Sequence, residues 1–97
     1  MTRIQVRKLI WEQWIIVHIK KHSVSVHEVE EAIKAIVLHK QGHDGRYIAI
    51  GRSGTRILSV IIKREKQGEY RIITDRDSDK KERRLVYVKE SNKNSNI

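Results

Sequence analysis

Apolar and polar residues recur with two different periods along this chain, and the periods predict helices before strands. Close to the N-terminus, Ile4 and Val6 are separated by polar residues, so a short strand is expected within residues 3–11. From residue 12 to residue 22 the apolar positions recur every three or four residues, the spacing of an amphipathic helix. The N-terminal part is therefore expected to contain one short strand followed by a helix.

A second helix is marked by a nearly complete start signal. Ser25 occupies the N-cap position, and Glu28 stands three residues later, where its side chain can bond back to the cap. Gly42 is the expected stop, so this helix is predicted to fill most of residues 25–41. Its expected buried stripe consists of Val26, Val29, Ile33, Ile36 and Val37.

Beyond the glycine-containing segment at residues 42–45 the apolar period falls to two, which predicts strands. Three are expected, at Tyr47–Arg52, Arg56–Glu65 and Glu69–Asp75. Each neighbouring pair is separated by a turn with a glycine at position 54 or 68. With two-residue turns at 53–54 and 67–68, the register pairs Ile50 with Ile57, Ile62 with Ile73, and Arg64 with Arg71.

The last segment returns to helical spacing. Asp79 is the expected N-cap, with Glu82 at the third helical position. The predicted fold class is α+β, a small antiparallel meander of three to four strands with two N-terminal helices and one C-terminal helix. Residues 1–90 are expected to form a single domain, and residues 91–97 a disordered polar tail.

The charge balance adds a class of partner to this picture. Lys and Arg number 21 against 12 Asp and Glu, which gives a formal net charge of +9. Residues 46–90 hold thirteen of the basic residues and seven of the acidic ones, so the excess belongs mainly to the strands and the last helix. This favours a polyanionic partner, a nucleic acid first, an acidic protein second and an anionic membrane third.

Composition also excludes several classes of protein. The chain has no cysteine, so it has no disulfide, thiolate nucleophile or zinc–thiolate site. No apolar run approaches the roughly 20 residues that cross a bilayer, and the N-terminus lacks a secretory segment. The motifs of P-loop, HExxH, G-x-S-x-G and EF-hand proteins are absent. A cytoplasmic protein without a cofactor is expected.

Two histidines of the first predicted helix are candidates for chemistry. His18 and His22 are four residues apart, a spacing that can bind one metal ion. No third ligand joins them by motif, so packing or hydrogen bonding is the favoured interpretation, and no metal site is expected. His22 has a further interpretation as a proton carrier near neutral pH.

The arginines give a stronger chemical signal than the histidines. They cluster around the two turns and the start of the last helix, at Arg52, Arg56, Arg64, Arg71, Arg76, Arg83 and Arg84. Guanidinium groups hold phosphate through paired hydrogen bonds, and a cluster beside a helix N-terminus is a candidate phosphodiester site. Neighbouring carboxylates could equally neutralise them, so the sequence leaves a functional and a structural interpretation open.

Three stretches of the sequence resemble the BrnT family of toxins. "WEQWIIVHIKKHSVSVHEVEEAI" is similar to the opening pattern of that family, and "RYIAIGRSGTRILSVIIKRE" to its central hairpin with a Gly-Arg-Ser turn. "RIITDRDSDKKERRLVY" resembles the closing segment, in which a strand leads into Lys-Glu-Arg-Arg-x-Tyr. Two departures matter, and the first is that the N-terminal nine residues extend beyond the usual start of the family pattern. The second is that Ser23 stands where the family usually has glycine, so a backbone position suited to a left-handed conformation must tolerate a Cβ.

The resemblance implies a RelE-like fold and a ribonuclease toxin of a type II toxin–antitoxin pair. Its implied partners are RNA and a cognate antitoxin, a BrnA-like DNA-binding protein, in a hetero-oligomer. We expect metal-independent cleavage in which the 2′-hydroxyl of the RNA attacks the adjacent phosphorus while the protein stabilises charge and moves protons. A non-enzymatic nucleic-acid-binding or antitoxin-binding module is the alternative.

Specific residues are assigned to these roles. The expected catalytic residues are His22, Arg64, Arg71, Arg76 and Arg83. The expected RNA contacts are Lys21, Arg52, Arg56, Lys63, Lys80 and Arg84. Secondary candidates for proton transfer are Lys21, Glu82 and Tyr87.

Overall fold

A computed structural model describes residues 4–94 and combines a five-stranded sheet with three helices. The elements in chain order are β1 (Lys8–Ile10), α1 (Gln13–Lys21), α2 (Val26–Lys34), β2 (Ile36–Gln41), β3 (Arg46–Ser53), β4 (Arg56–Lys66), β5 (Glu69–Asp77) and α3 (Lys80–Asn94). The strand order is β1-β5-β4-β3-β2, in which β1 is parallel to β5 and every other neighbouring pair is antiparallel. The predicted α+β class and all three predicted helices are confirmed.

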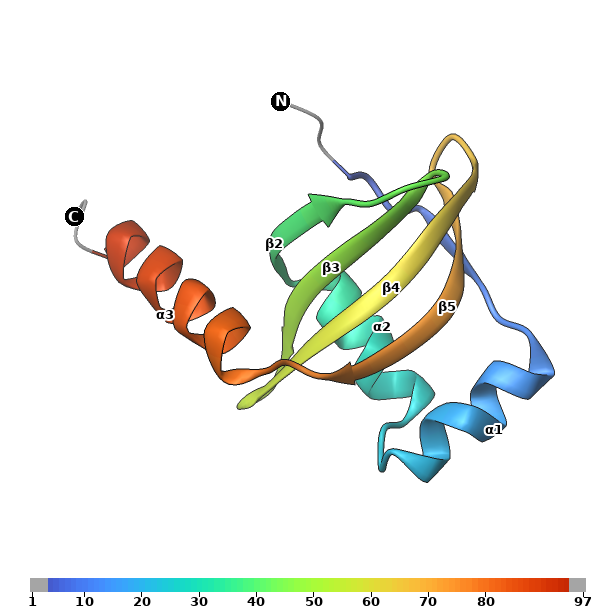
Figure 1. Ribbon diagram of the computed structural model, residues 1–97, viewed down its shortest axis with the longest axis horizontal. Helices are drawn as coiled ribbons and strands as arrows, with labels where there is room; N and C mark the ends of the chain where they lie inside the picture. The colour runs from blue at the N-terminus through green and yellow to red at the C-terminus, as the bar shows by residue number, and fades with distance from the viewer. Residues whose placement is uncertain (1–3, 95–97) are drawn as a thin grey trace.

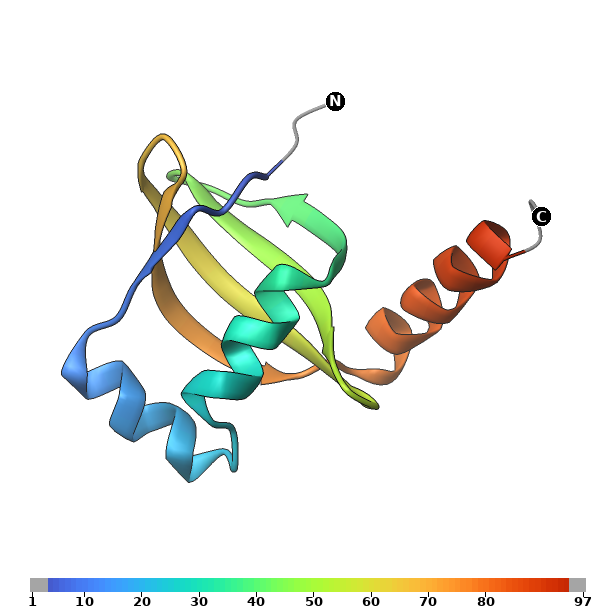
Figure 2. The same cartoon turned by 180° about the vertical axis from the view of Figure 1, so that it is seen from behind.

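The helices are distributed unequally over the sheet. Helices α1 and α2 both lie on one face, behind the sheet in Figure 1 and in front of it in Figure 2, whereas α3 extends away from the body. The main core therefore lies between α1, α2 and the sheet, and it contains Ile15, Val29 and Val60, all fully buried. A smaller cluster on the opposite face joins Ile50 and Ile57 to Val86 of α3.

The two edge strands of the sheet were predicted to different extents. The N-terminal strand lies at Lys8–Ile10, within the predicted range of residues 3–11 but after the alternation at Ile4 and Val6, and it pairs with β5. The predicted helix through residue 41 is wrong beyond Lys34, because Ile36–Gln41 forms β2 against β3. A short apolar run fits either element, and here the β-branched residues pair with the exposed edge of β3.

The predicted register is also wrong at the first turn, because the turn lies one residue later than predicted and each residue of β3 pairs two residues further along β4. The turn residues are 54 and 55, because Ser53 pairs with Arg56, and Gly54 supplies the positive φ of +62°. In consequence Ile50 faces Ser59 rather than Ile57.

Two irregularities in the β4–β5 ladder change the remaining predicted pairs. The register shifts between Ile61 and Ile62 and again between Arg64 and Lys66, as expected for β-bulges. The actual partners are therefore Ile62 with Ile72, Arg64 with Tyr70, and Lys63 with Arg71.

Both predicted helix caps are confirmed as reciprocal capping boxes. In α2 the Ser25 hydroxyl accepts from the Glu28 amide (3.1 Å), and the Glu28 carboxylate accepts from the Ser25 amide (3.0 Å). In α3 the Asp79 carboxylate accepts from the Glu82 amide, and Glu82 accepts from the Asp79 amide, both at 2.8 Å. Helix α3 continues to residue 94, so residues 91–94 of the predicted tail are helical, and residues 95–97 lie outside the described part.

None of the helices within residues 4–94 is both long and apolar enough to span a membrane.

Candidate functional site

The predicted site residues lie at two opposite ends of the sheet. One end holds the 54–55 turn and the start of α3, together with Arg52, Arg56, Arg76, Arg83, Arg84 and Lys80. The other end, beside the 67–68 turn, holds Lys63, Arg64 and Arg71. Arg56 and Arg64 are eight residues apart on β4, which corresponds to about 26 Å at the usual rise of a strand. The structure therefore does not bring all these arginines around one phosphate.

Four of the predicted arginines are already paired with carboxylates, namely Arg52, Arg56, Arg71 and Arg76. Arg52 donates to Glu90 on α3, with its Nη2 at 2.9 Å, and its guanidinium lies 5.9 Å from the ring centre of Tyr87. Arg71 pairs with Glu12 (2.9 Å) and Glu65 (2.7 Å). These contacts support the structural interpretation for Arg52 and Arg71.

A third of these paired arginines, Arg76, holds the start of α3 to the sheet. Its two terminal nitrogens donate to the two carboxylate oxygens of Glu82, at 2.6 and 2.9 Å. This hydrogen bonding lowers the pKa of Glu82 to about 2. Glu82 therefore stays ionised and occupied near neutral pH, which makes it an unsuitable proton carrier.

Arg56 differs because its contacts come from three segments of the chain. It donates in a fork to Asp77 (Nε to Oδ1 2.7 Å, Nη2 to Oδ2 3.0 Å), and its Nη1 donates to Glu28 (2.9 Å). The same Nη1 donates to the carbonyl oxygen of Ser23 (2.7 Å). Ser23 has φ +59°, so the predicted left-handed backbone at this position is confirmed. The unusual link between α1 and α2 is thus held against the sheet by Arg56.

A buried carboxylate beside this arginine was missed by the sequence analysis. Asp75 on β5 is 2% exposed, and neither of its oxygens has a hydrogen-bond partner within residues 4–94. Burial raises the pKa of Asp75 to about 6, although the positive charges of His22 and Arg56 oppose the shift. A buried acid without a partner that titrates near neutral pH is typical of a functional site.

The sequence held no clear signal for Asp75. Simple alternation from the buried Tyr70 and Ile72 would turn Thr74 inward and Asp75 outward. The irregularity of β5 at Ile73 reverses this order, so that Asp75 pairs with Val60 on the buried face. Only knowledge of the bulge could have identified it.

His22 lies at the C-terminal cap of α1 and completes this group. Its ring is exposed and lies 5.0 Å from the ring of His18, edge to face. His22 is also close enough to Asp75 for its charge to affect the pKa of that carboxyl. We call His22, Glu28, Arg56, Asp75 and Asp77 the Asp75 cluster.

The remaining predicted residues have fewer contacts. Arg83 donates to the carbonyl oxygen of Ser78, and its charge helps to lower the pKa of Asp77 after the larger effect of Arg56. It therefore lies near the Asp75 cluster. Within the described residues, no ion pair or side-chain hydrogen bond is formed by Lys21, Lys63, Arg64, Lys80 or Arg84.

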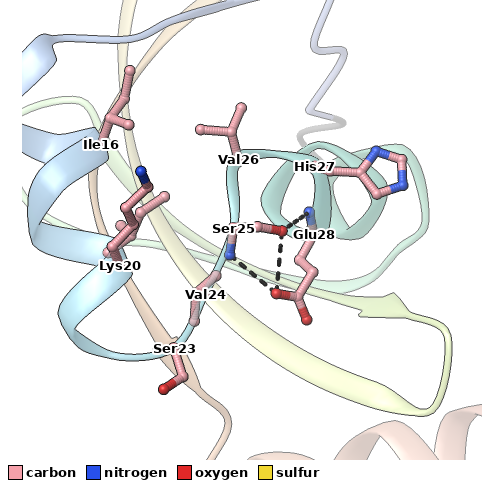
Figure 3. Close-up of a pocket in the computed structure, with 9 residues that line it drawn as sticks. Ile16, Lys20, Ser23, Val24, Ser25, Val26, His27 and Glu28 are labelled. Atoms are coloured by element: carbon pink, nitrogen blue, oxygen red, sulfur yellow. Dashed lines mark hydrogen bonds between the residues drawn. The ribbon is translucent and has the colours of Figure 1, made fainter.

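A cavity of about 480 Å³ opens between α1 and α2, beside the Ser25–Glu28 capping box (Figure 3). Ile16 and Lys20 of α1 line one side, and Val26 and His27 of α2 line the other. Its lining is mostly apolar, with Lys20 as its one lysine or arginine. Glu28 lines the cavity as well, so the cavity adjoins the Asp75 cluster at this residue.

Within residues 4–94, no three His, Asp or Glu side chains are grouped closely enough to hold a metal ion. His18 and His22 contact each other through their rings, in agreement with the packing interpretation.

Comparison with known proteins supports one relationship. No protein-family model matches the sequence. No curated protein matches it either. Among solved structures, the chain is similar to the crystal structure of the Brucella abortus ribonuclease toxin BrnT. The two share 25% sequence identity with a TM-score of 0.60, over 75% of this chain and 97% of that one. The resemblance to BrnT in the sequence motifs is thus confirmed, and the fold is BrnT-like.

Proposed function

We propose that this BrnT-like chain is the toxin of a type II toxin–antitoxin pair and acts as a metal-independent endoribonuclease. The observation that carries the proposal is the similarity to a ribonuclease toxin over 97% of that protein's length. The net charge of +9 supports a polyanionic substrate. The Asp75 cluster supports a location for the chemistry, because it combines a buried acid, a histidine and an arginine fork.

In the proposed mechanism the RNA supplies its own nucleophile, the 2′-hydroxyl. His22 exchanges protons with the reacting oxygens, since its ring is exposed to substrate and lies beside a carboxylate. Arg56 stabilises the additional charge on the phosphorus centre.

Arg56 can reach a phosphate by exchanging one of its carboxylates. Its fork to Asp77 matches the geometry with which guanidinium binds two phosphate oxygens. The Asp77 side chain is 58% exposed, whereas that of Glu28 is 28% exposed, so Asp77 is the more easily displaced partner. Glu28 and the Ser23 carbonyl would keep Arg56 in place during the exchange. Arg83, which lies near Asp77, is positioned to neutralise the released charge.

The residues at the far end of β4 are proposed to serve binding. Lys63 and Arg64 have no carboxylate partner within the described residues. They lie seven and eight residues along β4 from Arg56, about 23 and 26 Å, so they can contact the RNA only away from a phosphate held by Arg56. Arg71 can join them if RNA displaces Glu12 or Glu65. Lys21, Lys80 and Arg84 extend the positive surface at the other end of the sheet.

Expression of the chain alone in bacteria tests the function. Growth arrest together with loss of intact RNA is expected, and full growth with intact RNA would contradict it. His22→Ala should lower the cleavage rate by a factor on the order of 100 or more. The matched control is His27→Ala, whose side chain on α2 is 82% exposed and should not matter.

Purified protein tests the mechanism. A substrate with 2′-deoxynucleotides should resist cleavage, and chelators should have no effect. Arg56→Lys retains the charge but loses the fork, so it should lower the rate by about 100-fold. Asp77→Asn should retain cleavage, because it removes the competitor of phosphate. Equal cleavage rates for the parent and Arg56→Lys would remove Arg56 from the mechanism. The double variant Arg64→Ala plus Arg71→Ala tests, by the same comparison of cleavage rates, the arginines beside the 67–68 turn.

Antitoxin binding is proposed as a second function, and α3 supports it. Leu85, Tyr87 and Val88 on this helix are 39%, 52% and 53% exposed. A projecting helix with exposed apolar side chains is typical of a surface that a partner protein covers. Replacement of all three residues by serine should abolish co-purification with the cognate antitoxin and leave RNA cleavage intact.

A further inference from the structure

We infer that the exposed side of α1 is a stacking platform for the bases of single-stranded RNA, built from Trp14, His18 and His22. We call these three side chains the α1 ladder. The inference rests on the proposed function, since it names the part of the protein that would hold the substrate strand beside the reacting phosphate. It concerns the bases of the RNA, whereas the arginines concern its phosphates.

The geometry of the ladder carries the inference. Its residues recur every four positions, so the rings follow one another along one side of α1. The ring centres of Trp14 and His18 are 6.4 Å apart, and those of His18 and His22 are 5.0 Å apart. Trp14 is 56% exposed, although an indole is a side chain that folding normally buries in large part. The core therefore does not explain the position of the Trp14 ring, whereas His18 is half-buried and His22 is exposed.

Charge selects a nucleic acid as the occupant of this surface. Helix α1 contains no acidic residue, and its last turn carries His18, Lys20 and Lys21. Exposed rings beside cations are the arrangement with which proteins bind single strands, because bases stack on the rings and phosphates meet the cations.

The ends of the ladder connect it to both groups of predicted site residues. At its start, the Trp14 indole donates to Glu12 (3.3 Å), which also accepts from Arg71 at 2.9 Å. At its end, His22 belongs to the Asp75 cluster. The ladder thus follows β5 from the neighbourhood of Arg71 to that of Asp75, which are four residues and about 13 Å apart. A strand stacked on α1 would deliver its backbone to both ends.

Binding of a non-cleavable probe tests the platform independently of catalysis. The probe is a fluorescein-labelled single-stranded oligoribonucleotide with 2′-O-methyl groups, and the comparison probe has the same backbone without bases. Trp14→Ala should bind the complete probe on the order of 10-fold more weakly, since one stacking contact is lost. Trp14→Phe should restore most of the affinity and Trp14→Leu should not. His27→Ala on α2 is the control for an exposed ring outside the ladder.

The abasic probe separates stacking from charge. All variants should bind it equally, because it has no base to stack. Unchanged binding of the complete probe by Trp14→Ala would overturn the inference, as would an equal loss on both probes. Loss of antitoxin binding by Trp14→Ala, with RNA affinity unaffected, would assign this surface to a protein partner instead.

The same experiment distinguishes the two proposals from one another. A chain that cleaves RNA although Trp14→Ala binds the probe normally would retain the ribonuclease function and lose the platform. A chain whose binding depends on Trp14, but which cleaves nothing, would keep the platform and lose the enzymatic function.

Discussion

Helices α2 and α3 begin with the same capping motif but relate to the sheet in opposite ways. Helix α2 buries Val29, Ala32 and Ile33 against the central strands. Helix α3 is six residues longer (15 against 9), yet Val86 is the one residue in a buried cluster among those of its residues whose burial is described. Its remaining attachments to the sheet include the ion pairs Arg52–Glu90 and Arg76–Glu82.

The difference separates residues that fold the chain from residues available for partners. Burial of apolar side chains contributes most of the stability of a small domain, whereas a partly exposed ion pair such as Arg52–Glu90 contributes less. We therefore expect α2 to unfold only together with the sheet and α3 to open locally. A helix that opens at low cost is well suited to be covered by a partner, in agreement with the proposed antitoxin surface.

The largest effect is expected from the closest contact between α2 and the sheet. A Cβ on Gly51 would lie 1.9 Å from the carbonyl oxygen of Ala32, a backbone atom that cannot move without α2. Gly51→Ala should lower the free energy of unfolding by about 4 kcal/mol or more, measured by urea denaturation. Gly54→Ala in the turn is the control, since nothing lies within 4 Å of its Cβ position and only backbone strain remains. Comparable losses in both variants would mean that α2 is not packed this closely.

Removal of one buried valine from each interface tests the contrast directly. Val29 and Val86 are both fully buried, but Val29 lies in the large core and Val86 in the small cluster. Val29→Ala should cost about 2–3 kcal/mol of global stability. Val86→Ala should cost about 1 kcal/mol, because the thin cluster can collapse around the smaller side chain.

Amide hydrogen exchange of the two variants shows which elements lose stability in each. Val29→Ala should raise exchange throughout the sheet, and Val86→Ala chiefly within α3. Equal losses of global unfolding free energy in Val29→Ala and Val86→Ala would contradict the expectation that α2 unfolds with the sheet and α3 opens locally.

The carboxyl groups of Asp75 on the sheet and Glu82 on α3 should contribute to folding stability with opposite dependence on pH. The folded-state pKa of Asp75 is raised to about 6, so its contribution is present below pH 4 and lost as the pH rises through 6. The folded-state pKa of Glu82 is lowered to about 2, so its contribution is present above pH 4.5 and lost as the pH falls towards 2. Asp75→Asn should therefore gain on the order of 2 kcal/mol over the parent between pH 4 and pH 7.

Denaturation at a series of pH values measures this difference. The difference curve between Asp75→Asn and the parent removes the titration of distant groups that both proteins share. The charged or titratable groups that face Asp75 are His22, Glu28, Arg56 and Asp77, and they are present in both proteins. Glu82→Gln should instead lose stability relative to the parent above pH 4.5. A flat difference curve for Asp75→Asn would mean that the buried carboxyl has an ordinary pKa.

Much of the fold was predictable because its signals are local. The caps at Ser25 and Asp79 depend on residues three positions apart, and the alternation of β3 to β5 depends on residues two apart. Strand β2 was not predictable, since Ile36–Gln41 fits a helix equally well until the free edge of β3 is present to pair with it.

The site was less predictable because it depends on register and on pairing. Arg56 was identified from its place beside a turn, but its carboxylate partners come from α2 and β5, far away in sequence. Asp75 depends on a bulge, and the ladder depends on which side of α1 the sheet covers. Charge and motif therefore indicated the class of partner, whereas the arrangement of charges required the fold.

The two capping boxes offer the smallest and most closely matched test. Ser25→Ala and Asp79→Ala each remove one side-chain acceptor from a helix start. The local loss should be about 1 kcal/mol in both cases. For Ser25→Ala it should appear in full in the urea unfolding free energy, because α2 and the sheet unfold together.

For Asp79→Ala the loss should appear mainly as faster amide exchange in α3, with a much smaller change in global stability. Asp79 is exposed, so its removal leaves no buried group unsatisfied. Equal shifts of the urea midpoint would show that α3 unfolds with the sheet after all. In that event the exposed Leu85, Tyr87 and Val88 would belong to a rigid surface, and a partner would bind it without first having to order the helix.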